Sequence, residues 1–185
     1  MQIKFLEQEI AYDGSQLISH WIFNQWGLQG NATVAFIGPC DVKIEHMVDL
    51  IDRNEGKKIA SDSMLHFIIE FFGTDLAQTI LWQRLLVSLV QQEIAFRSKS
   101  PTIIRAGNDL YDGEAKLSVS IATASPISTL IHYGLNISSL NTPVKTKGLN
   151  DYKIEPIPFA KAILETFRHE IKTAHDARSK VRGVS

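Results

Sequence analysis

The sequence predicts an α+β fold in one domain over residues 1–185: a mixed, mostly antiparallel sheet packed against helices. Three observations lead to this prediction. Short apolar segments with strand-like composition recur along the chain, a long segment with helical spacing interrupts them, and a second helical segment follows them. A chain of 185 residues is also long enough to bury a sizeable core.

The first part of the chain predicts three strands and a helix. Residues 3–10 suggest a strand that ends at an Asp-Gly turn. Apolar residues at helical spacing predict a helix over 15–27. The segment "ATVAFIG" at 32–38 is a continuous apolar run, and "SMLHFIIEFF" at 63–72 is rich in aromatic and β-branched residues, so both predict strands.

The second part predicts a long helix, three strands in succession and a final helix. From Thr74 onward leucine and isoleucine recur at helical spacing. Strands are predicted over 102–111, 115–123 and 128–138, with Asp-Gly in the first hairpin turn. One apolar stripe predicts a helix over 158–175. We expect the helices to lie on one side of the sheet.

Composition and charge exclude some functional classes. A net charge of −1 gives no basic surface for nucleic acid or for an anionic membrane. The first ten residues lack the apolar core of a signal peptide, and no apolar run is long enough to span a bilayer. One cysteine excludes an internal disulfide framework and agrees with a reducing compartment. We therefore expect a cytoplasmic protein.

Two neighbouring strands each carry one small or polar face. Side chains alternate across a strand, so the polar residues of each strand share a side. In 115–123 and 128–138 these residues are Lys116, Ser118, Ser120, His132, Gly134 and Asn136. If the two faces coincide, they form a concave ligand surface with Lys116 at its rim. The alternative is a solvated outer face, where such residues are common.

A second candidate site lies in "GPCDVKIEHMVDLIDR" at 38–53. Cys40 and His46 could form a thiolate nucleophile with its base. Cys40 could instead join His66 in a zinc site, or be a small buried residue with no chemical role. His66 is expected in the core or in a pocket, and Glu70, on the same side of its strand, needs a partner if buried.

The segments "RAGNDLYDGEAKLSVSIA" and "LIHYGLNI" resemble the central part of the biotin/lipoate protein ligase superfamily. Asn108 and Asp109 match its N-D-L element. Lys116 matches the lysine that, in lipoate ligases, contacts the acyl carboxylate and the activated acyl phosphate. His132 and Gly134 match the H-H-G strand of the lipoate branch. The resemblance implies the superfamily's fold, a mixed sheet packed on helices, and its habit of forming homodimers.

The sequence departs from that superfamily at two places. Arg105 stands where biotin ligases have the lysine of K-W-P-N-D, and arginine keeps its charge but cannot act as a base. The glycine-rich phosphate loop is absent; the corresponding segment reads "DRNEGKKIASDSMLHF". The sequence therefore does not decide whether the protein uses ATP. The resemblance implies ATP as cofactor, and the missing loop argues against it. The segments "GPCDV", "MLHFI" and "LSVSIAT" also resemble those of an uncharacterised prokaryotic family.

These observations support three functional hypotheses. The first is a ligase-like or acyltransferase-like enzyme that binds a small carboxylate or acyl ligand, with Lys116, Asp109 and His132 as its catalytic groups. Arg105, Asn108 and the polar sheet face would then contact the ligand. The second is a non-catalytic module that binds a small metabolite in the same place. The third is a transferase or hydrolase centred on Cys40 and His46.

Overall fold

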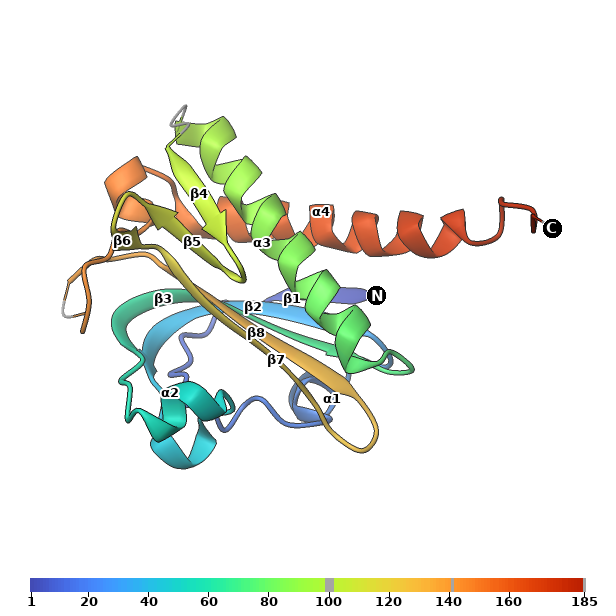
Figure 1. Ribbon diagram of the computed structural model, residues 1–185, viewed down its shortest axis with the longest axis horizontal. Coiled ribbons are helices and arrows are strands. Elements are labelled where there is room, and N and C mark those ends of the chain that lie inside the picture. The colour runs from blue at the N-terminus through green and yellow to red at the C-terminus, as the bar shows by residue number, and fades with distance from the viewer. Residues whose placement is uncertain (99–101, 141, 185) are drawn as a thin grey trace.

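The computed structural model describes residues 1–98, 102–140 and 142–184, and a five-stranded sheet forms its centre (Figure 1). The strands lie in the order β1-β2-β3-β8-β7. Their bounds are β1 Gln2–Phe5, β2 Ala32–Asp41, β3 Ala60–Phe71, β8 Thr129–Asn136 and β7 Ser118–Ala124. Only the β1–β2 pair among these is parallel. The predicted mixed, mostly antiparallel sheet is confirmed.

A second, three-stranded sheet consists of β4 (Ile103–Ala106), β5 (Asp109–Asp112) and β6 (Ala115–Lys116). The predicted single strand over 102–111 is wrong, because the backbone turns at Gly107, whose φ is 64°. Only glycine adopts this left-handed conformation without steric cost. The predicted strand over 115–123 is also divided, since Leu117 separates β6 from β7.

Two long helices cover one face of the central sheet, and short helices lie on the other (Figure 1). The long ones are α3 (Leu76–Ser98) and α4 (Pro156–Ala177), and the short ones are α1 (Trp21–Trp26) and α2 (Leu50–Asn54). Single 3-10 turns, η1 and η2, occupy Ile44–His46 and Leu149–Tyr152. The expectation of helices on one side therefore holds for the long helices and is wrong for the short ones.

The helix expected over 15–27 is limited to α1 for a local reason. Asp13 Oδ1 accepts hydrogen bonds from the backbone and the hydroxyl of Ser15, which hold this segment in a turn. His20 has a φ of 64°, which a continuing helix cannot contain. Its backbone N–H donates instead to the buried Glu70 carboxylate, at 2.9 Å to Oε1. Glu70 thus has the partner that its burial requires.

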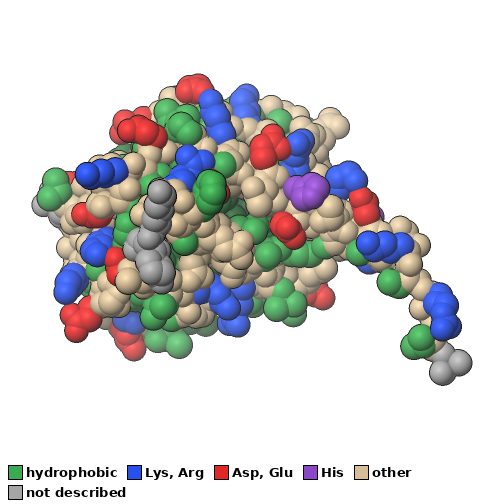
Figure 2. Space-filling view, turned by 90° about the horizontal axis from the view of Figure 1, so that it is seen from above, with side chains coloured by type: hydrophobic (Ala, Val, Ile, Leu, Met, Phe, Trp, Pro, Cys, Tyr) green, Lys and Arg blue, Asp and Glu red, His purple; other side chains and the backbone are tan. Residues whose placement is uncertain are grey.

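The core between the sheet and the long helices brings together distant parts of the sequence. Phe67, Tyr133, Phe159 and Phe167 are fully buried there. At the sheet edge α4 packs on β1, where Lys161 Nζ lies 5.6 Å from the centre of the Phe5 ring. On the α3 and α4 side, acidic and basic side chains are interspersed over the surface (Figure 2). None of the described helices has the length and apolarity needed to cross a membrane.

Candidate ligand site

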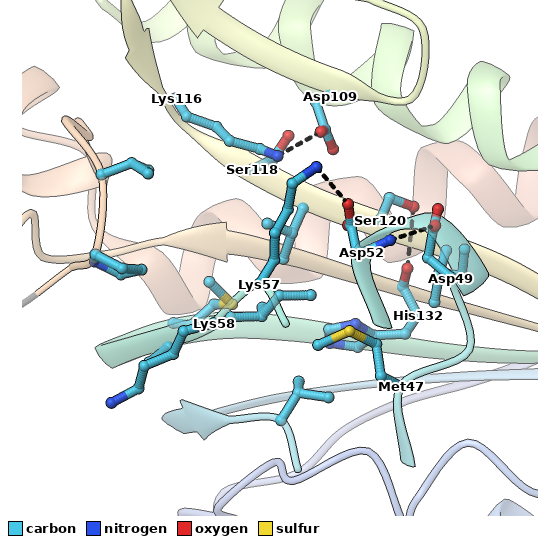
Figure 3. Close-up of a pocket in the computed structure, with 18 of the residues that line it drawn as sticks. Met47, Asp49, Asp52, Lys57, Lys58, Asp109, Lys116, Ser118, Ser120 and His132 are labelled. Carbon is cyan, nitrogen blue, oxygen red and sulfur yellow. Dashed lines mark hydrogen bonds and ion pairs between the residues drawn. The ribbon is translucent and has the colours of Figure 1, made fainter. Parts of the chain in front are cut away.

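The described residues enclose a cavity of about 560 Å³ between α2, the β3–β8–β7 end of the sheet and residues 142–146 (Figure 3). This volume falls in the range of sites for small organic molecules. Charged groups line part of it, namely Asp49, Asp52, Lys57, Lys58, Asp109 and Lys116. Apolar groups line another part, among them Val42, Met47, Met64, Val119, Ile121 and Val144.

An ion pair between Lys116 and Asp109 projects into this cavity (Figure 3). Lys116 Nζ lies 2.7 Å from Asp109 Oδ2, and the lysine side chain is 29% exposed. Asp109 Oδ1 is buried without a hydrogen-bond partner among the described residues. Burial raises the pKa of the Asp109 carboxyl, and the Lys116 charge only partly opposes that shift. The lysine is therefore held in place by a carboxylate and still reaches the cavity.

A second charged group comes from α2 and the loop after it. Asp49 caps the helix, because its Oδ1 accepts hydrogen bonds from the backbone N–H groups of Ile51 and Asp52. Lys57 Nζ lies 2.8 Å from Asp52 and 2.9 Å from Glu55. Lys58 lines the same cavity and has no ion-pair partner among the described residues. Both lysines belong to the segment that the sequence resemblance aligns with the glycine-rich loop.

Two buried histidines form a hydrogen-bonded pair beside the cavity. His66 Nδ1 lies 3.0 Å from His132 Nε2, and His66 Nε2 lies 3.2 Å from the carbonyl oxygen of Gly38. Burial lowers the pKa of His66 to about 3, and burial together with His66 lowers that of His132. Tyr12 stacks on His132, with ring centres 3.8 Å apart. Both imidazoles are therefore neutral, and His132 is the one that lines the cavity.

The predicted coincidence of polar faces is wrong for the two serines. In the β7–β8 pair Ser120 lies opposite Tyr133, while Val119 lies opposite Gly134. Opposed residues of an antiparallel pair point to the same side, so the serine side chains leave the sheet on the α3 side. Ser120 Oγ accepts a hydrogen bond from Gln83 of α3 and donates one to the His132 carbonyl. Both serines still border the cavity, because β7 is an edge strand.

Ser118 and the two predicted asparagines are held by the structure around the cavity. Ser118 Oγ accepts a hydrogen bond from the backbone N–H of Leu110. Asn108 donates from Nδ2 to the Ser120 carbonyl, and Asn136 donates to the Lys116 carbonyl at 3.4 Å. Both asparagines line the cavity. Their contacts fix β5, β6 and β7 around the Lys116–Asp109 pair.

Gly134 and Arg105 lie outside the cavity wall. A Cβ at Gly134 would be 2.3 Å from Met64 Sδ, so this glycine makes room for a neighbouring side chain rather than for a ligand. The exposed Arg105 donates a hydrogen bond to the Gly107 carbonyl, two residues away. His66 is likewise outside the wall and reaches it only through His132.

The structure does not support the Cys40–His46 hypothesis. Cys40 is buried, does not line the cavity, and has a pKa raised to about 12, first by burial and then by Asp41. His46 Nδ1 is hydrogen-bonded to the backbone oxygen of Asp13 instead. Among the described residues no group of three or more histidine, cysteine or acidic side chains could hold a metal ion. The structure therefore gives neither a thiolate nucleophile nor a zinc site here.

Comparison with solved structures defines the class of fold. The chain is similar to a point mutant of biotin protein ligase from Aquifex aeolicus in complex with biotin, at 13% identity and a TM-score of 0.62, over 93% of this chain and 70% of that one. It is also similar to Ta0514, a putative lipoate protein ligase from T. acidophilum with bound lipoic acid, at 14% identity and a TM-score of 0.56, over 92% and 85%. The fold is that of biotin/lipoate ligase catalytic domains.

Within that class the chain belongs to the family described as "Domain of unknown function (DUF366)", whose model matches residues 1–182. It is 35% identical over 163 residues to the uncharacterized protein MJ0805 of Methanocaldococcus jannaschii, which covers 85% of this chain and 73% of that protein. A solved protein of unknown function from Pyrococcus horikoshi is 35% identical, with a TM-score of 0.91 over 100% of this chain and 99% of that one.

Proposed function

We propose that this protein binds a small molecule with a carboxylate or acyl group in the cavity, and that Lys116 contacts this group. The observation that carries the proposal is the Lys116–Asp109 pair. The lysine has one tethering partner at 2.7 Å, is partly exposed, and lines the cavity. An ammonium that is oriented but not fully coordinated can form a charge-assisted hydrogen bond with an incoming carboxylate.

The apolar part of the cavity supports a ligand with a hydrocarbon portion. Met47, Met64 and Ile121 line the space that Lys116 also reaches. Such a wall favours alkyl groups, whose burial contributes roughly 0.8 kcal/mol per CH₂. Biotin and lipoic acid, bound by the two similar structures, both carry a carboxylate on an alkyl chain. Octanoate is the simplest probe with these two features.

The test is calorimetric titration of the protein with octanoate, lipoate and biotin. Lys116→Met keeps the alkyl stem and removes the charge, so it should weaken binding of any bound carboxylate at least tenfold. Lys147→Met is the matched control. Lys147 Nζ forms an ion pair at 2.6 Å with Asp112, which lies on β5 as Asp109 does, and Lys147 does not line the cavity. Equal loss in both variants, or none in Lys116→Met, would contradict the proposal.

A second candidate function is acyl transfer through an adenylate. It is favoured by Lys58, a lysine of the cavity wall without an ion-pair partner among the described residues, which belongs to the segment that the sequence resemblance aligns with the phosphate loop. In this reaction a carboxylate oxygen attacks the α-phosphorus of ATP, the bond to the β-phosphate oxygen breaks, and pyrophosphate leaves. Carboxylate-dependent exchange of labelled pyrophosphate into ATP tests this step. If a carboxylate binds but supports no exchange, the adenylate step is excluded for that carboxylate and only the binding function remains.

A further inference from the structure

The hydrogen bonds of the histidine pair determine where each proton lies. The Gly38 carbonyl can only accept, so His66 carries its proton on Nε2 and donates it to that oxygen. His66 is fully buried and neutral, so its Nδ1 is an acceptor. His132 must then donate from Nε2 to His66 Nδ1 across 3.0 Å. One backbone carbonyl thereby fixes the tautomers of both rings.

This arrangement leaves one unused acceptor. His132 is neutral and its proton is on Nε2, so Nδ1 carries a lone pair. Nδ1 has no hydrogen-bond partner among the described residues, although His132 is 3% exposed and lines the cavity. The ring cannot turn freely, because Tyr12 stacks on it with an interplanar angle of 10°. Phe36 stacks in the same way on His66.

We propose that the bound molecule carries an N–H or O–H group that donates a hydrogen bond to His132 Nδ1. This inference rests on the proposed function, since it places the donor on the same molecule whose carboxylate contacts Lys116. It narrows the ligand class from plain acyl chains to hydroxylated, amide-bearing or ureido-bearing carboxylates. His132 is then a specificity-determining residue that accepts a hydrogen bond from the ligand and neither takes up nor releases a proton.

The first part of the test needs no ligand. Long-range ¹H–¹⁵N NMR of histidine-labelled protein distinguishes the two neutral tautomers from the charged ring. The signals that disappear in His66→Gln and His132→Gln identify the two rings in the spectrum of the wild type. We expect both wild-type signals to be those of the neutral Nε2–H tautomer from pH 5 to pH 8. A His132 signal from the Nδ1–H tautomer, or one that titrates near the ordinary histidine pKa of about 6.5, would overturn the inference.

The second part compares octanoate with hydroxyoctanoates that carry the hydroxyl at different positions. At least one of them should bind about tenfold more tightly than octanoate, since one good hydrogen bond is worth about that factor. If octanoate binds and no hydroxyl improves it, the donor inference fails while the proposed function stands. If no carboxylate binds, the proposed function fails and this inference fails with it.

Two variants test whether the gain in affinity from the hydroxyl group depends on His132 Nδ1. The amide of His132→Gln can occupy the Nε2 position and still donate to His66, but it places no acceptor at Nδ1. Asparagine is shorter, so His132→Asn places its amide oxygen near the Nδ1 position. We expect the ratio of hydroxyoctanoate to octanoate affinity to fall to about one in His132→Gln and to stay above one in His132→Asn. The same ratio in wild type and His132→Gln would contradict the assignment.

Discussion

Asp109 and Asp112 lie three residues apart on β5, and their surroundings shift their pKa values in opposite directions. Burial raises the pKa of Asp109, whose Oδ1 has no partner among the described residues. Hydrogen bonds from Lys147 and Tyr152 lower the pKa of Asp112. One strand thus carries one carboxyl group whose pKa is raised and one whose pKa is lowered.

This contrast predicts opposite effects of pH on stability. A carboxyl with a raised folded pKa binds more protons in the folded state than in the unfolded state, so its contribution to stability falls as pH rises above the ordinary value of about 3.9. The free energy of unfolding of wild type relative to Asp109→Asn should fall over that range. The free energy of unfolding of wild type relative to Asp112→Asn should instead rise with pH up to about 3.9, because this contribution is lost as pH falls below that value. Urea unfolding at a series of pH values measures both differences; slopes of the same sign would contradict the assigned environments.

Replacement of Gly134 should destabilise the protein through packing. An added Cβ would be 2.3 Å from Met64 Sδ and 3.4 Å from His132 Cε1. Gly134→Ala should therefore cost about 1–3 kcal/mol of unfolding free energy, as overpacked cores do. In the double variant with Met64→Ala the overlap is relieved, so the total cost should be smaller than the sum of the two single costs. Simple additivity in urea denaturation would show that Met64 is not the obstacle.

Glu70 links α1 to the sheet and to the loop before β8, and its removal should be costly. Glu70 Oε1 accepts from the His20 backbone N–H at 2.9 Å and from the Ser128 hydroxyl at 2.7 Å. Glu70→Ala leaves both donors without this acceptor and should cost about 1–3 kcal/mol. Glu70→Gln keeps one oxygen and should cost less. The hydrogen-exchange rate of the His20 amide should rise in Glu70→Ala, and an unchanged rate would contradict this contact.

Cys40 should be chemically inert in the folded protein. Its pKa is raised to about 12 and it is buried, so little thiolate forms at neutral pH and reagents cannot reach it. An aromatic disulfide reagent that releases a coloured thiolate on reaction should therefore modify Cys40 only as fast as the protein unfolds. The same reagent should react at once in denaturant, and Cys40→Ala should serve as the blank. Fast modification of the native protein would revive a role for this thiol.

The sequence was sufficient to predict the fold class and the composition of the individual strand faces. Alternation correctly places His132, Gly134 and Asn136 on one side of β8, away from Tyr133. The relation between β7 and β8 could not be obtained in this way, because alternation is unchanged when one strand slides by one residue. That one-residue difference puts Ser120 on the opposite side from His132.

Some of the cavity wall had no signal in the sequence. Tyr12 comes from a segment without a recognisable motif, whereas Met47 and Lys58 come from segments that were singled out for other residues or for a missing loop. Tyr12 is placed by backbone hydrogen bonds to Pro39 and Asp41 at the end of β2. The histidine pair was missed for a similar reason, since His66 and His132 lie 66 residues apart and meet only through strand pairing.

The contact between β1 and α4 has a consequence for how this protein acquires its structure during translation. Phe5 is made long before Lys161, whose ammonium group lies over its ring. Contacts between segments so far apart in sequence form slowly, because a long loop must close first. The nascent chain therefore leaves this edge of the sheet uncovered until residues 156–177 have emerged, and uncovered apolar surface at a strand edge favours aggregation during that interval.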